Sequence, residues 1–167
     1  MALSKQMCGI LVMGAGKERA ARDFYLQASR RTKHAVGQKM FKRLADEEAK
    51  HEQLLQSWAN QEVCPVDVTF PDVDREFLKK GRAKASEAVK PDTTDLQAVE
   101  LAQDMERKSI AFYEDAAAKA TDNASRDLFM RLKAAEDKHL ALLTDLYDYM
   151  VNPNLWSVRD QHSHFDA

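Results

Sequence analysis

The chain has 167 residues, of which 31% are charged and 44% are hydrophobic, a composition typical of one helix-rich soluble domain with a substantial core. Its 25 basic and 27 acidic residues are interspersed, so no basic stripe predicts binding to nucleic acid. The longest apolar segment, residues 7–15, is too short to span a membrane. The two cysteines, Cys8 and Cys64, form no CxxC pair and no disulfide framework, which favours a reducing, cytoplasmic location.

The first half of the chain predicts a helical hairpin over residues 4–60. Its first helix covers residues 4 to about 32, with Ser4 as the N-cap. A break near residues 33–37 leads to the second helix, about 38–59. A glycine inside the first helix, at position 14, costs roughly 1 kcal/mol relative to alanine, which indicates close packing or a bend at this point.

A long connection follows over residues 61–91 and contains a possible short helix at 74–89. Helices in bundles are usually joined by about 2–8 residues. The length of this connection therefore predicts a crossover along the bundle. At the other end of the chain, residues 151–167 show no period and are interpreted as a polar tail, including His162 and His164.

The second half predicts a matching hairpin over residues 92–150. Its first helix begins after a proline, with Thr93 or Thr94 as the cap, and runs to about residue 120. A turn then introduces the last helix, about 125–150. The bundle domain is therefore assigned to residues 1–150.

Each hairpin carries a Glu and a His three residues apart, Glu48 with His51 and Glu136 with His139. On a helix, side chains at this spacing leave the same face and can bind one ion. The other inward positions of the two stripes are apolar: Phe41, Leu44 and Leu55, and Phe129, Leu132 and Leu143. A buried charge without a partner costs on the order of several kcal/mol. A bound cation would compensate this cost, although a single such pair is usually only a solvated surface pair.

The two hairpins are copies of each other at a shift of 88 residues, which is the separation of Glu18 from Glu106. Over residues 18–55 the shift pairs 13 identical residues, whereas random pairing would give about 2 or 3. An internal repeat of this kind predicts a four-helix bundle with a pseudo-two-fold axis. That axis brings the two Glu/His pairs together in the core.

The first helix of each hairpin adds one inward glutamate among small and apolar neighbours. Glu18 lies on a line with Leu11, Gly14, Ala21, Tyr25 and Ala28, and Glu106 lies on a line with Val99, Ala102, Ile110, Tyr113 and Ala117. Single glutamates on two helices and a Glu-x-x-His on each of the other two are the ligand arrangement of di-iron or di-manganese carboxylate bundles. The four carboxylates would neutralise two divalent ions, and mixed oxygen and nitrogen ligands favour iron or manganese.

On these motifs and on its two Phe-Tyr pairs, the chain resembles the rubrerythrin branch of the ferritin-like superfamily over roughly residues 4–150. The resemblance implies an all-α four-helix bundle with two iron ions, for which manganese or zinc are possible substitutes. It implies that Glu48 and Glu136 bridge the metals and that the terminal ligands are Glu18 with His51 and Glu106 with His139. It also implies that Tyr25 and Tyr113 hydrogen-bond to ligand carboxylates.

The resemblance implies reduction of hydrogen peroxide or dioxygen and a homodimer, in which hairpins could be exchanged between chains. Typical rubrerythrins carry a rubredoxin-type domain with two CxxC pairs, and this sequence has none, so the electron donor would be a separate protein such as a rubredoxin. Peroxidase members have an additional Glu one turn beyond the second single Glu. Ser109 occupies that position here, which makes the site closer to the symmetric centres of bacterioferritin-like proteins.

Three functions are compatible with these residues. The first is a di-iron oxidoreductase, the second is an iron oxidation and handling protein without peroxidase turnover, and the third is a helical interaction module with a structural metal site. Tyr25 and Tyr113 could equally be plain core aromatics. Three acidic neighbours of the Glu/His pairs are interpreted as surface charges: Asp46, Glu47 and Asp137.

Overall fold

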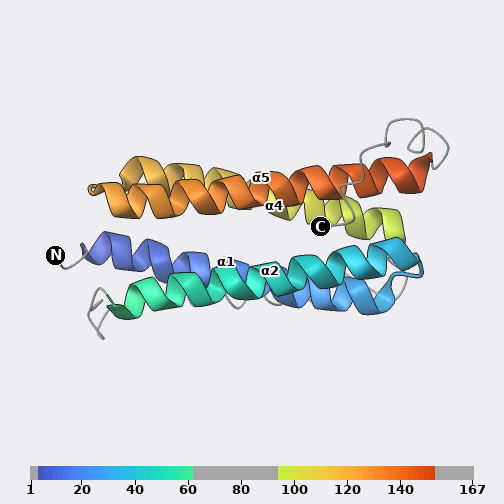
Figure 1. The fold of residues 1–167 in the computed structure, drawn as a ribbon, viewed down its shortest axis with the longest axis horizontal. Coiled ribbons are helices and arrows are strands. Elements are labelled where there is room, and N and C mark those ends of the chain that lie inside the picture. The colour runs from blue at the N-terminus through green and yellow to red at the C-terminus, as the bar shows by residue number, and fades with distance from the viewer. Residues whose placement is uncertain (1–3, 62–93, 153–167) are drawn as a thin grey trace.

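A computed structural model describes residues 4–61 and 94–152 of the chain (Figure 1). These residues form four long helices and no strand: α1 (Lys5–Arg31), α2 (Ala35–Gln61), α4 (Asp95–Lys119) and α5 (Asn123–Val151). α1 packs along α2 and α4 packs along α5, while α1 faces α4 and α2 faces α5. The predicted all-α bundle of two helical hairpins is confirmed.

The order of the helices requires a long connection between the two hairpins. In Figure 1, α2 ends at one end of the bundle and α4 begins at the other. The predicted crossover between them falls on residues that the structure does not describe. Residues 62–93, with the short helix predicted at 74–89, lie outside the described residues, as does the predicted tail from residue 153 onwards.

Side-chain caps fix where three of the helices begin. The Ser4 hydroxyl accepts a hydrogen bond from a first-turn N–H of α1 at 3.1 Å, as predicted. Thr94, one of the two predicted candidates, forms a reciprocal capping box with Gln97 at the start of α4. Asp122 caps α5. These side chains satisfy N–H groups that have no partner inside the helix.

α2 begins at Ala35, three residues before its predicted start at Gln38. Gly37, which was interpreted as part of the break, lies inside the helix. A Cβ atom at this position would stand 3.0 Å from the Met150 side chain, so the glycine permits close contact with α5. At Gly14 a Cβ would stand 3.2 Å from Leu55, which agrees with the predicted close packing.

Two apolar cores lie on either side of the Glu/His residues along the bundle. One contains residues 21–28 of α1 with residues 40–45 of α2, and it continues into α4 and α5. The other is centred on Leu11, Leu55 and Phe129. On every helix the candidate metal-binding residues fall between the segments that form these two cores. The predicted inward stripes are thus confirmed, with one exception: Ser109 is buried on α4, whereas Ile110 is only half-buried.

Two predictions from the sequence, one about membrane spans and one about the cysteines, have different outcomes. No helix in the described residues is long and apolar enough to cross a membrane. Cys8, in contrast, is fully buried and disulfide-bonded, and its partner lies outside the described residues. The expectation of reduced cysteines is therefore wrong, and cysteine usage does not support a reducing compartment, because structural disulfides persist mainly in oxidising ones.

Candidate metal centre

The six side chains predicted to bind metal meet in the middle of the bundle. α1 and α4 each contribute one carboxylate, from Glu18 and Glu106, and α2 and α5 each contribute a Glu and a His one turn apart. Five of the six residues are buried, and His51 alone is intermediate. The Glu-x-x-His spacing places both side chains of each pair on the inward stripe of its helix.

At one end of the centre, the His51 Nδ1 atom faces three carboxylates. It lies 3.0 Å from Glu48 Oε2, 3.2 Å from Glu136 Oε1 and 4.0 Å from Glu18 Oε2. These residues form one group whose ligand atoms all lie within 4.8 Å of one another. The group offers three oxygens and one nitrogen, a donor set that suits iron or manganese.

At the other end, the His139 Nδ1 atom faces an equivalent set. It lies 3.1 Å from Glu48 Oε1, 3.6 Å from Glu136 Oε2 and 3.7 Å from Glu106 Oε1. Glu48 and Glu136 therefore belong to both groups, and each directs one oxygen to either imidazole. The two rings are nearly parallel, with centroids 5.5 Å apart. This is the pseudo-two-fold arrangement that the repeat predicts.

Several buried atoms of the centre have no hydrogen-bond partner in the described part of the chain: Glu48 Oε1, Glu136 Oε1 and His139 Nδ1. The neighbouring nitrogen and oxygen atoms are close, but they are not aligned for hydrogen bonds. Buried polar groups normally have such partners. Unpartnered lone pairs that converge from four helices fit a site built for cations, so the residues present are suited to metal.

Burial and mutual repulsion shift the protonation of the two single glutamates. Burial raises the pKa of Glu18 well above its usual value, and the charges of Glu48 and Glu136 raise it further. Burial likewise raises the pKa of Glu106 to about 10, together with contacts to Glu136. Protein groups alone thus favour protonated carboxyls here. Cations would be needed to hold all four carboxylates in the charged form.

The pKa values of the two imidazoles shift in the direction opposite to the one expected from burial alone. Burial favours the neutral ring of His51, but the nearby carboxylates of Glu136 and Glu48 outweigh it and raise its pKa to about 9. The pKa of His139 is raised as well, because the nearby carboxylates of Glu136 and Glu47 outweigh burial. Without metal, protons on these rings take the role of the missing positive charge, and metal binding must displace them.

Two tyrosines connect the hairpins by hydrogen bonds to the single glutamates. The Tyr25 hydroxyl donates to Glu106 Oε1 and the Tyr113 hydroxyl donates to Glu18 Oε1. Each tyrosine therefore orients a carboxylate of the other hairpin. Burial raises the pKa of both hydroxyls well above 10, which keeps them protonated as donors. These hydrogen bonds are of the kind that the predicted supporting role requires.

Glu47, which was predicted to be a surface charge, contacts the centre. Its Oε2 atom lies 2.8 Å from His139 Nε2, and its Oε1 atom accepts a hydrogen bond from Arg43. The hydrogen bond with His139 lowers the pKa of Glu47 to about 2. A carboxylate on the outer nitrogen of a metal-binding histidine fixes the orientation of the ring. Asp46 and Asp137 are exposed, as predicted.

The fold and this cluster define a class of protein: a ferritin-like helical bundle with a buried carboxylate and histidine site that could hold metal. The sequence model of the Rubrerythrin family matches residues 9–147, which is most of the chain. The protein belongs to the rubrerythrin family, and the resemblance found in its motifs is confirmed. Neither the curated proteins nor the solved structures contain a significant match to the chain.

Proposed function

We propose that this protein is a non-haem di-iron oxidoreductase that reduces hydrogen peroxide or dioxygen. The observation that carries the proposal is the pair of overlapping groups that share Glu48 and Glu136. In this proposal Glu48 and Glu136 would help to hold both metals, while Glu18 with His51 would hold one of them and Glu106 with His139 would hold the other. Manganese or zinc could replace iron at the same donors.

Two ferrous ions bound here would supply one electron each, enough to reduce one hydrogen peroxide to two water molecules with two protons. The four carboxylates balance the charge of two divalent ions. The Tyr25 and Tyr113 hydroxyls donate hydrogen bonds to Glu106 and Glu18. These bonds fix the orientation of the two carboxylates. The buried setting strengthens these electrostatic contacts.

The first experiment is anaerobic loading with ferrous ion, followed by metal analysis and stopped-flow mixing with peroxide or dioxygen. We expect about two irons per chain and oxidation faster than that of free ferrous ion. The double variant Glu48→Gln/Glu136→Gln serves as the negative control. A chain that binds no iron would refute the metal centre and favour the alternative of a helical interaction module.

A second candidate is iron oxidation and handling without turnover of an external reductant. Ser109 favours it, since this buried serine stands where peroxidase members carry an additional Glu. The corresponding residue in the first hairpin is Ala21, so neither half supplies a further ligand there. Repeated peroxide turnover with a reduced rubredoxin as electron donor would exclude this candidate. Oxidation that stops after one turnover, with release of iron, would support it.

The protein is further proposed to be a homodimer, with its electron donor on a separate chain. The end of α2 and the start of α4 lie at opposite ends of the bundle (Figure 1), so a hinge between them could send the second hairpin to a partner. Size-exclusion chromatography with light scattering measures this directly. A monomer at micromolar concentration would refute the dimer.

A further inference from the structure

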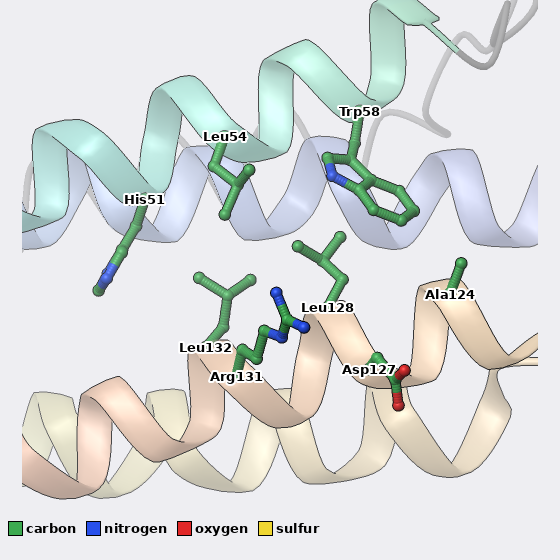
Figure 2. Close-up of a pocket in the computed structure, with 8 residues that line it drawn as sticks. All are labelled: His51, Leu54, Trp58, Ala124, Asp127, Leu128, Arg131 and Leu132. Atoms are coloured by element: carbon green, nitrogen blue, oxygen red, sulfur yellow. The ribbon is translucent and has the colours of Figure 1, made fainter.

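A cavity of about 410 Å³ opens at the His51 end of the centre, between α2 and α5 (Figure 2). Leu54 and Trp58 line it from α2, and Leu128 and Leu132 line it from α5. His51 forms its inner end. A cavity of this volume suits a small organic molecule, and it is larger than hydrogen peroxide or dioxygen requires.

At the repeat-equivalent position beside His139, the described residues place buried apolar side chains where the cavity lining would be. A shift of 88 residues replaces Trp58 by Leu146 and Leu128 by Met40. Both of these residues are buried in one apolar core, and Leu142, the counterpart of Leu54, packs against it. The side chains there fill the space that stays open beside His51. The difference between the two imidazoles agrees with this, because the His51 side chain is 16% exposed and that of His139 is 1% exposed.

One cation faces the cavity without a carboxylate partner. Arg131 lines the cavity, and its guanidinium rises from α5 toward α2 between Leu128 and Leu132 in Figure 2. No residue in the described part of the chain forms an ion pair or hydrogen bond with it. Asp127 also lines the cavity, but its carboxylate points away from α2 in Figure 2.

The repeat explains why this arginine has no partner. Its counterpart Arg43 donates to Glu47, one turn further along α2, at 3.2 Å. The residue one turn after Arg131 is Ala135, which cannot accept a hydrogen bond from a guanidinium. Ala135 thus has two consequences. His51 has no carboxylate on its outer side, and a positive charge lies at the mouth of the cavity.

We propose that this cavity is a binding site for a small carboxylate with an apolar chain. The carboxylate would pair with Arg131, for which a guanidinium provides two parallel hydrogen bonds. The chain would lie between the leucines and Trp58, with its end near the outer face of His51. The proposal does not depend on the oxidation chemistry, because none of the residues that would contact the carboxylate binds metal.

Isothermal titration of the metal-free full chain with octanoate tests the site. We expect saturable binding of one octanoate per chain with a dissociation constant below roughly 1 mM, and an affinity that falls about fourfold for each methylene removed. Arg131→Gln should weaken binding by about tenfold or more. The matched control is Arg43→Gln, the same change at the repeat-equivalent position, which should leave the affinity unchanged.

Nuclear magnetic resonance locates the bound molecule. Octanoate should shift the signals of the Trp58 indole and the His51 ring and leave the His139 ring unaffected. Arg131 is exposed, so its variant should keep the wild-type circular dichroism spectrum and unfolding temperature. The proposal is overturned if wild type shows no saturable binding, if Arg131→Gln binds as tightly as wild type, or if the shifted signals lie elsewhere.

Discussion

The two ends of the centre share their inner groups and differ in what surrounds them. Each imidazole faces one single glutamate and two shared glutamates at comparable distances. Behind His139 stand Glu47 and Arg43, whereas behind His51 there is a cavity with an unpaired arginine. The repeat has kept the groups that would contact a metal and has changed the groups one layer further out. The inner groups therefore indicate what is bound, and the outer ones indicate how each end is used.

The largest expected effect concerns the glutamates that both ends share. Glu136→Gln removes a carboxylate from both groups, so we expect it to abolish tight binding of both metals. Glu106→Gln affects only the His139 group, so about one metal per chain should remain. Metal analysis after anaerobic loading measures the difference. Asp137→Asn, which changes an exposed neighbour, should retain the full metal content, and equal losses in the two glutamate variants would contradict the shared role of Glu136.

A carboxylate stands behind His139 but not behind His51, and a substitution at either end can remove this difference. Glu47→Gln should weaken metal binding at the His139 end by about 10–100-fold, because the ring loses the carboxylate that orients it. Ala135→Glu, the reciprocal change, should strengthen binding at the His51 end. Competition with a metal chelator gives both affinities. If Glu47→Gln binds both metals as the wild type does, the contact between Glu47 and His139 is not functional.

The metal-free centre should make the protein less stable as pH rises. The folded pKa of Glu106 is about 10 against an ordinary 4.5, and that of His51 is about 9 against 6.5. Each raised pKa contributes stability that is complete below the unfolded value and is lost as pH approaches the folded value. Glu47 acts in the opposite direction, since its pKa of about 2 contributes stability that is lost as pH falls from 4.5 toward 2.

Thermal unfolding of the metal-free protein should therefore show its highest midpoint near pH 5 and a steady fall toward pH 9. The metal-loaded protein should not show this fall, because the metals replace the protons. Glu106→Gln should remove part of the alkaline loss from the metal-free protein. A midpoint that rises between pH 5 and pH 9 without metal would contradict the shifted pKa values.

The repeat made the inner site predictable from the sequence, and it also explains what was missed. Glu18 and Glu106 could be found because a shift of 88 residues superposes them. Glu47 could not be found in this way, since its counterpart is Ala135 and a search for shared residues overlooks what only one half contains. The cavity was not predicted, for the same reason. Its prediction would also have required the knowledge that Trp58 of α2 and Arg131 of α5 face each other across the bundle.

The fold was predictable to the level of elements and less so at their ends. The hydrophobic period identified every described helix, but α2 begins earlier than predicted because Gly37 is a contact residue and not a break. On α4 the inward line passes through Ser109, because a small polar residue can occupy a crowded inward position that apolarity alone assigns to Ile110. The disulfide of Cys8 could not be predicted, because neither cysteine lies in a sequence motif that indicates pairing.

The smallest expected effect concerns the two tyrosines, which test whether the inner groups at the two ends of the centre are equivalent. Tyr25→Phe removes the donor to Glu106 and Tyr113→Phe removes the donor to Glu18. Each change leaves one buried carboxyl oxygen without a partner, which should lower the free energy of unfolding by about 1–3 kcal/mol. Because the inner groups are equivalent, we expect similar losses from the two variants in urea denaturation of the metal-free protein. A difference above about 1 kcal/mol would exceed the error of additive mutational effects, and the asymmetry would then extend from the outer layer into the centre itself.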